Sequence, residues 1–261
     1  MSGSVPAHPV HPARRALLLG LAAGGLGAVA PAFATETVRI VTEEYPPYNY
    51  TDNGKITGLG TDVVQAVLRE INVEGQIQSL PWARAYETAQ NTDSVLIYSM
   101  NRSKEREKLF KWVGQITPTD FYLFSLKSRN LQINELADTK NLQIGTVNQD
   151  VGEQFLVQNG FAVGRNLQSS NRYELNYEKL KRGRIDLWIM NELGAYYMAR
   201  QAGDDPSAVL QKSLRIAELS GGGNYMAFGL KTPDALVDRF RKGLEAVKRN
   251  GIYDALQRKW L

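Results

Sequence analysis

The sequence contains no cysteine, and its only two histidines, His8 and His11, lie near the amino terminus. Without cysteine there are no disulfides, so stability must come from ordinary apolar cores. Without histidine beyond residue 11, the rest of the chain cannot form Ser-His-Asp or Cys-His nucleophile systems or the usual zinc sites. An enzyme built from this chain would have to use carboxylates, lysine or tyrosine. We therefore expect no metal and no cofactor, and the absences argue against catalysis.

A single apolar run near the amino terminus, Ala16–Ala30, is shorter than the ~20 residues that a membrane span needs. Arg14 and Arg15 precede it, and Ala32-Phe33-Ala34 follows with the small-x-small pattern of a cleavage site. We interpret residues 1–34 as a signal peptide, cleaved near Ala34, and expect a soluble protein exported to the periplasm. The paired arginines are a weak match to the twin-arginine route, so the choice between that route and the general one stays open.

An excess of one charge sign is also missing. The formal net charge is +4, and two of the positive charges, Arg14 and Arg15, belong to the predicted signal peptide. Such a balanced charge does not favour nucleic acid as a partner. The glycine run Gly221–Gly223 lacks the Lys-Ser/Thr ending of a phosphate-binding loop, so we interpret it as a flexible connection.

What the chain does have is alternation of strand and helix patterns, which is typical of an α/β fold. We predict strands at 37–42, 73–80, 95–99, 110–116, 119–127, 142–147, within 161–169, and at 187–190, 214–219 and 225–230. We predict helices from Thr61 as the cap to about 71, from Pro81 onward, at 151–158 with Asp150 as the cap, and at 173–182, 193–202, from 233 onward and 252–260.

This order predicts two doubly wound α/β lobes of similar build. The strands 119–127 and 225–230 would join them as a two-stranded hinge, and the last helices would return to the first lobe. The predicted lobes are 35–124 with 224–261, and 125–223. Hinged lobes of this kind close around a ligand.

Residues 101–112 place five cations and two glutamates directly after the apolar strand at 95–99. Open α/β sheets bind ligands at the carboxyl ends of their strands, and there Arg106 would offer a planar fork of donors to a carboxylate. The alternative is a solvated helical turn whose charges all face water. Trp82 likewise follows a strand, beside Arg84, and is either core or a ligand wall.

Several motifs resemble the family 3 extracellular solute-binding proteins, the amino-acid-binding components of ABC importers. The motifs are Tyr45-Pro46-Pro47-Tyr48, Gly58-Leu59-Gly60-Thr61-Asp62, Ser103-Lys104-Glu105-Arg106 with Trp112 beyond it, Ile144-Gly145-Thr146, and Lys181-Arg182-Gly183-Arg184-Ile185-Asp186. The resemblance covers the whole chain after the signal peptide. It implies a type II periplasmic binding protein fold.

The resemblance also implies roles for individual residues. Arg106 matches the arginine that clamps a ligand carboxylate, and Tyr45 and Trp82 match the aromatic sandwich. Polar contacts are implied for Ser99, Asn101, Asn148 and Gln149, the last two through loop N–H groups. The position of the acidic anchor for the ligand ammonium falls on Asn191, which is neutral, and Arg84 adds a second candidate cation.

Asn191 cannot supply the negative charge that an ammonium group needs, which leaves two possibilities. Either Glu192, Glu43 or Glu44 holds the ammonium of an amino acid, or the ligand is a different carboxylate-bearing polar solute. We expect a monomer that delivers this solute to the membrane permease of an ABC importer. One alternative is an enzyme similar to the cyclohexadienyl dehydratases, with Glu192 or Glu44 as general acid. Another alternative is that the protein is itself a sensor domain. Separately, its partner could be a sensor instead of a permease.

Overall fold

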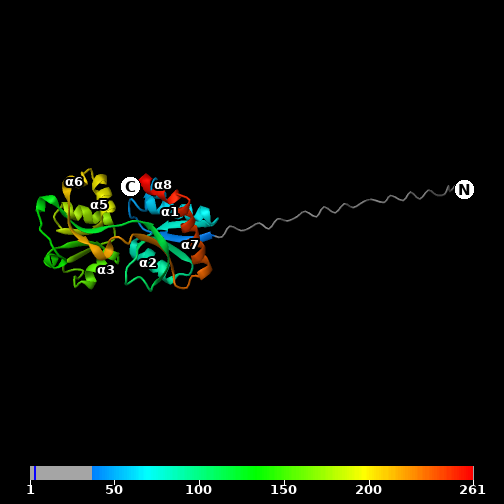
Figure 1. Cartoon of the computed structure of the whole chain (residues 1–261), viewed down its shortest axis with the longest axis horizontal. Coiled ribbons are helices and arrows are strands. Elements are labelled where there is room, and N and C mark those ends of the chain that lie inside the picture. Colours follow the sequence, from blue (N-terminus) through cyan, green and yellow to red (C-terminus); the bar gives the residue numbers. More distant parts are fainter. Residues whose placement is uncertain (1–2, 4–36, 261) are drawn as a thin grey trace. The chain divides into compact units, whose positions relative to one another are not determined.

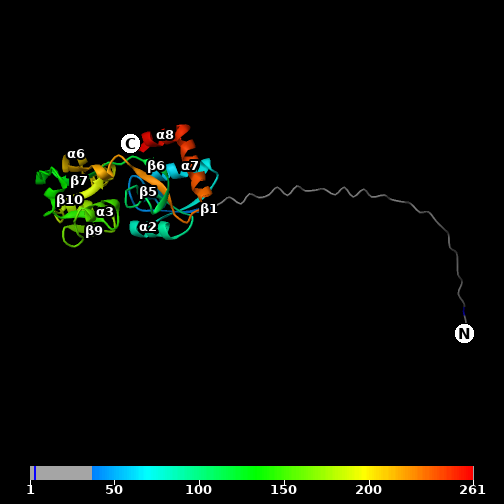
Figure 2. The same ribbon diagram turned by 60° about the horizontal axis from the view of Figure 1, so that its bottom comes forward.

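The computed structural model describes residue 3 and residues 37–260, and residues 35–261 form one compact unit. The predicted signal peptide and its cleavage site lie outside the described residues, apart from residue 3. Figures 1 and 2 show two sheets with their helices, one drawn mostly in blue, cyan and orange-red and the other in green to yellow. No helix in the described part of the chain is long and apolar enough to cross a membrane.

The first sheet has the strand order β4-β1-β5-β12-β6. Its strands are β1 (Thr37–Thr42), β4 (Glu74–Ser79), β5 (Val95–Asn101), β6 (Phe110–Thr117) and β12 (Asn224–Gly229). Strands β4, β1 and β5 are parallel, and β12 runs antiparallel to both β5 and β6. Its helices are α1 (Leu59–Glu70), α2 (Trp82–Asn91), α7 (Asp234–Arg249) and α8 (Ile252–Trp260).

Both faces of this sheet are covered, which explains why β5 is apolar almost throughout. Leu96 and Tyr98 belong to the apolar cluster of α1 and α7, while Val95 and Ile97 belong to the cluster of α2. Figures 1 and 2 accordingly show α1, α7 and α8 on one side of the sheet and α2 on the other.

The second sheet has the order β11-β7-β10-β8-β9. Its strands are β7 (Phe121–Leu126), β8 (Ile144–Val147), β9 (Leu167–Ser170), β10 (Leu187–Asn191) and β11 (Leu210–Ile216), and its helices are α3 (Val151–Gln158), α4 (Tyr173–Lys181), α5 (Glu192–Gln201) and α6 (Pro206–Val209). Strands β9, β8 and β10 are parallel, whereas β7 and β11 are antiparallel additions. Short 3-10 turns occupy 127–129, 136–139 and 217–219.

The predicted fold of two α/β lobes is confirmed. Three strands in each sheet are parallel, and the others pair antiparallel because they come from the segments where the chain crosses between sheets. By sheet membership these crossings lie between Thr117 and Phe121 and between Ile216 and Asn224. The lobe boundaries after residues 124 and 223 stay a prediction.

Local predictions failed at a few places. The strand expected at 214–219 is instead β11 at Leu210–Ile216, and a 3-10 turn follows it. The hairpin of β2 (Tyr50–Asp52) and β3 (Lys55–Thr57) was not predicted.

The predicted cap at Thr61 is wrong because α1 begins two residues earlier. Gly58 precedes it with φ 117°, and a Cβ there would lie 2.5 Å from the carbonyl oxygen of Tyr48. Only glycine fits this close approach, and it brings α1 against the loop after β1.

Candidate ligand-binding site

The candidate site is formed where strands of both sheets end, the position at which open α/β sheets bind ligands. Glu43 and Tyr45 follow β1, Trp82 follows β4, and Asn101 is the last residue of β5. From the second sheet, Gln149 follows β8 and Asn191 ends β10. The hydrogen bonds described below join these segments across the two lobes.

Arg106 lies at the centre of this group, in the turns between β5 and β6, and is only 1% exposed. Its Nε donates to Gln154 Oε1 at 3.1 Å, Nη1 donates to the carbonyl oxygen of Asn101 at 3.2 Å, and Nη2 donates to that of Gln149 at 3.3 Å. Asn101 belongs to the first lobe, whereas Gln149 and Gln154 belong to the second. The guanidinium therefore spans the crevice between the lobes.

Aromatic rings enclose the same guanidinium. Its central carbon lies 5.0 Å from the ring centre of Trp82 and 5.2 Å from that of Tyr86, within the range of cation–π attraction. Trp82 Nε1 donates to the carbonyl oxygen of Gln149 at 2.8 Å, so the indole also bridges the lobes. Burial lowers the pKa of Arg106 from its ordinary value, and the nearby Tyr86 and Asp150 oppose this effect.

Asn191 joins the second lobe to two tyrosines of the first. Its Oδ1 accepts from the hydroxyl of Tyr48 at 3.0 Å and from the backbone N–H of Gly194 at 2.8 Å, and its Nδ2 donates to the hydroxyl of Tyr45 at 2.5 Å. Asn191 is fully buried and also caps α5. Its side chain therefore acts as a neutral link between the lobes.

Two buried carboxylates, one from each lobe, interact electrostatically with Arg106. Glu43 is 6% exposed and accepts a long hydrogen bond of 3.4 Å from the hydroxyl of Tyr173. Burial raises the pKa of Glu43 well above its ordinary value, with Asp150 adding to this effect and Arg106 opposing it. Burial likewise raises the pKa of Asp150 to about 7, although the N–H of Glu153 stabilises its charged form.

Other predicted site residues lie in different surroundings. Arg84 is exposed on α2. Asn148 and Gln149 are exposed, and their N–H groups already donate to the carbonyl oxygen of Ser170 and to Glu153 Oε1. Asn101 is buried and donates from Nδ2 to Thr119 Oγ1.

Ser99 and Gln149 have unusual backbone geometry for residues with side chains. Their φ angles are 59° and 58°, in the left-handed region that favours glycine. The ladder of β5 with β12 is irregular around Ser99, and its buried Oγ has no hydrogen-bond partner among the described residues. Strained residues of this kind cluster at functional sites.

Glu43, Asp150 and Tyr173 are central to the site but were not among the residues predicted from sequence. Glu43 had been considered only as a substitute acid and Asp150 only as a helix cap. The signal for Glu43 was its position directly after β1. For Tyr173, which stacks against Tyr45 with ring centres 4.7 Å apart, no local signal pointed to the crevice.

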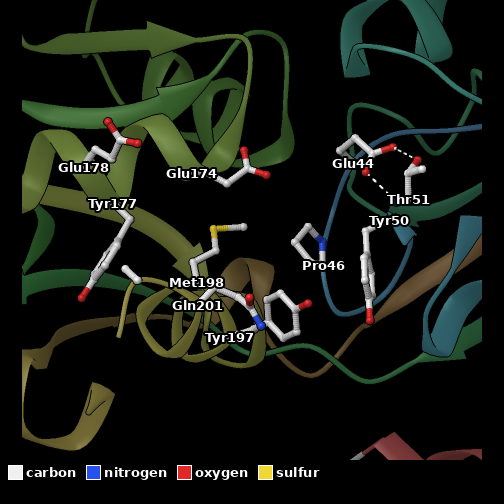
Figure 3. Close-up of a pocket in the computed structure, with 11 residues that line it drawn as sticks. Glu44, Pro46, Tyr50, Thr51, Glu174, Tyr177, Glu178, Tyr197, Met198 and Gln201 are labelled. Atoms are coloured by element: carbon white, nitrogen blue, oxygen red, sulfur yellow. Dashed lines mark hydrogen bonds between the residues drawn. The ribbon is translucent and has the colours of Figure 1, made fainter. Parts of the chain in front are cut away.

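Two adjoining pockets open beside this group. One, of about 330 Å³, is lined by Glu43, Glu44, Thr51, Trp82 and neighbouring residues. The other, of about 350 Å³, shares Glu44 and Thr51 with it and extends along α4 and α5 (Figure 3). The described residues contain no group of three or more His, Cys, Asp or Glu side chains able to hold a metal ion.

The chain resembles known proteins in both sequence and fold. The bacterial extracellular solute-binding proteins, family 3, match residues 38–261. The arginine-binding extracellular protein ArtP of Bacillus subtilis (strain 168) is 21% identical over 220 residues, 83% of this chain and 82% of its own. A probable amino-acid ABC transporter-binding protein of Haemophilus influenzae is 25% identical over 238 residues, 87% of this chain and 85% of its own.

Solved structures show the same fold at low sequence identity. An ancestral arginine-binding protein bound to arginine matches with TM-score 0.75 and 22% identity, over 86% of this chain and 98% of its own. A histidine kinase sensor domain with similarity to periplasmic binding proteins has TM-score 0.77 and 18% identity, over 87% of this chain and 96% of its own. The ancestral amino-acid-binding protein AncCDT-1, a precursor of cyclohexadienyl dehydratase, has TM-score 0.69 and 19% identity, over 86% and 94%.

The fold is that of a periplasmic amino-acid-binding protein of type II, with two α/β lobes and a crevice at their strand ends. The family model matches residues 38–261, which include nearly all of the described residues. The chain belongs to the bacterial extracellular solute-binding proteins, family 3.

Proposed function

We propose that this protein captures a small polar solute with a carboxylate, an amino acid or a related compound, between its two lobes in the periplasm. It then presents the solute to the membrane permease of an ABC importer. The names of its relatives support this proposal, since they include an arginine-binding protein and a probable amino-acid ABC transporter-binding protein. The partner and the identity of the solute are part of the proposal.

The observation that carries the proposal is the state of the Arg106 guanidinium. A guanidinium has five N–H donors in a planar fork. Three of them bond to Asn101, Gln149 and Gln154. One donor on each terminal nitrogen therefore stays available within the described structure. A carboxylate can accept both in a bidentate pair, which is the strongest common geometry for this recognition.

The rest of the predicted site would complete the ligand contacts. Tyr45 and Trp82 would form apolar walls, and Ser99, whose Oγ is unpartnered, would supply a polar contact. Asn148 and Gln149 would serve only if ligand binding released their N–H groups from Ser170 and Glu153. Closure of the lobes would desolvate the ligand and strengthen each polar contact.

We further propose that the protein is a monomeric binder and not an enzyme. Its relatives are named as binding proteins. The likeness to AncCDT-1 shows the fold alone, and the dehydratase remains the alternative to this proposal. Conversion of prephenate or arogenate to an aromatic product by the purified protein would overturn the non-enzymatic proposal.

The carboxylate clamp is tested by isothermal titration with the tightest ligand found in a thermal-shift screen of amino acids, polyamines and small organic acids. Arg106→Lys keeps the charge but removes the fork, so we expect affinity to fall about 10- to 100-fold, as for a lost charge-assisted pair. Arg102→Lys is the matched control, because Arg102 lies in the same segment and pairs outward with Glu107. Equal affinity in both variants would contradict the clamp.

A further inference from the structure

We propose that the second lobe has a binding site for a phosphate-bearing anion, in a pocket of about 430 Å³ beside β9 and α4. Its lining includes residues 169–171 at the end of β9, and Lys179, Arg182 and Arg184 at the end of α4 and just beyond it. We call it the basic pocket. None of the residues proposed above to contact the solute lines it. It is therefore a site separate from the crevice, and it goes beyond the proposed function.

The basic pocket has more positive than negative charge. Three cations line it, whereas Glu178 is the one acidic residue among the described residues that do so. Glu178 lies 3.7 Å from Arg182, and both side chains are more than half exposed, so this pair is weak. Lys179 and Arg184 have no carboxylate within ion-pair distance in the described part of the chain. Two charges of the pocket are therefore left without a counter-ion from the protein.

Lys179 is the half-buried cation of the pocket, and a hydrogen bond fixes its position. Its Nζ donates to Ser170 Oγ at 2.8 Å, and Ser170 Oγ in turn donates to Asn176 Oδ1 at 2.9 Å. Burial lowers the pKa of Lys179, and the positive charge of Arg184 adds to this effect. An ammonium group has three donors, so two remain for a ligand. An anion placed between Lys179 and Arg184 would offset the repulsion of their charges.

Arg184 supplies an exposed guanidinium on a fixed backbone. Its backbone N–H donates to the carbonyl oxygen of Lys179 at 2.9 Å, and its own carbonyl oxygen accepts from Gln168 Nε2 of β9 at 2.9 Å. Its guanidinium makes no hydrogen bond to a side chain or backbone group of the described residues. The planar fork of donors is therefore free to bind an anion bidentately, the geometry in which arginine recognises phosphate.

The edge of the sheet adds neutral donors to the same pocket. Strand β9 lies at the edge of the second sheet and, among the described strands, pairs with β8 alone. The carbonyl oxygens of Asn166 and Ser170 accept from the N–H groups of Ile144 and Asn148. Because alternate residues of a strand bond to the same neighbour, the N–H of Ser169 points away from β8. Ser169 Oγ is buried and has no hydrogen-bond partner among the described residues, so Ser169 has polar groups that a ligand can satisfy.

Phosphate suits this combination of groups better than a carboxylate does. A phosphate monoester has three strong acceptor oxygens and a charge of about −1.5 to −2 at pH 7. It can therefore meet both unpaired cations, Lys179 and Arg184, and still accept from Ser169. A carboxylate has two oxygens and a single charge. The phosphate can belong to a free anion or to the head group of a membrane lipid, and the experiment distinguishes these sources.

The test uses two probes on the full mature chain at constant ionic strength. Inorganic phosphate is titrated by calorimetry, and vesicles of phosphatidylcholine, alone or mixed equally with phosphatidylglycerol, are used for co-sedimentation. We expect binding of phosphate, of the mixed vesicles, or of both. The double variant Lys179→Gln with Arg184→Gln should weaken it at least about tenfold, because two charge-assisted contacts are lost. Arg165→Gln with Arg200→Gln is the control. It changes the net charge equally at exposed positions outside the pocket lining, and should alter affinity less than about twofold.

Four results would overturn the basic pocket as a phosphate site. They are no binding of either probe, equal loss in both double variants, and loss in Arg106→Lys with retention in Lys179→Gln/Arg184→Gln, which would place the anion in the crevice. The fourth is pocket-dependent binding of a polyglutamate peptide without binding of phosphate or vesicles, which would assign the pocket to an acidic protein segment. An unchanged circular dichroism spectrum, and unchanged affinity for the crevice solute, would show that the pocket variant is folded.

Discussion

Asp150 has two roles at the residue scale. It caps α3 by accepting the N–H of Glu153 at 2.7 Å, as the sequence predicted, and it is buried where Arg106 and Glu43 interact with it electrostatically. The cap follows from a short local pattern, in which an aspartate precedes a helix. The burial could not be predicted, because Glu43 and Arg106 reach Asp150 from distant parts of the chain. The same reason hid Tyr173 and the link from Asn191 to Tyr45.

The raised pKa of Asp150 makes a prediction about stability and pH. The native state binds this proton up to about pH 7, whereas the unfolded chain releases it near the ordinary value of 3.8. The unfolded state therefore binds fewer protons between these values, and the free energy of unfolding falls as pH rises through this window. The groups that face Asp150 are Glu43, Glu153 and Arg106.

Asp150→Asn removes the titration but keeps a side chain that can cap α3. We expect a weaker fall in melting temperature between pH 4 and pH 8, and a melting temperature at pH 8 above that of the wild type. A gain of about 1 kcal/mol corresponds to roughly 2–4 °C for a protein of this size. Differential scanning calorimetry across this range measures the effect. Parallel curves for the two proteins would show that Asp150 does not titrate with a raised pKa in the native state.

At the scale of elements, long periodic segments were predicted well and pairing was not. The helices α3 and α8 have the predicted limits, and β1 does also. The position of β12 between β5 and β6 depends on a pairing with residues more than a hundred positions away, which no local pattern encodes. The same limit explains the missed start of β11 at Leu210, whose partners lie in β7.

The helix α7 supplies a test of the first lobe's core. Phe240 is fully buried and packs edge-on against Phe228 of β12 with ring centres 5.1 Å apart. We expect Phe240→Ala to lower the free energy of unfolding by about 3–5 kcal/mol, as for other large-to-small core substitutions. Urea denaturation followed by circular dichroism measures this loss.

Leu230→Ala is the control for this core, because Leu230 lies directly after β12 and is 51% exposed. We expect its effect to stay within about 0.5 kcal/mol. A loss below about 1 kcal/mol for Phe240→Ala would mean that α7 does not pack on the sheet as described.

At the scale of the whole molecule, the contacts between the lobes gather at the strand ends. Asn191 reaches Tyr48, Trp82 reaches Gln149, and Arg106 reaches Gln154, so each lobe supplies part of the same crevice. Near the carboxyl end of the chain, Lys259 and Trp260 of α8 both donate hydrogen bonds to Asp62 of α1. These bonds attach α8 to the first lobe. Because both lobes contribute residues to the crevice, a solute bound there would contact both of them.

The central claim is that a solute binds in this crevice with its carboxylate on Arg106, and a crystal structure of the mature protein with its tightest ligand tests it most directly. We expect both carboxylate oxygens of the ligand to lie within about 3 Å of the terminal nitrogens of Arg106. A ligand bound elsewhere, or in the crevice without contact to Arg106, would contradict the account.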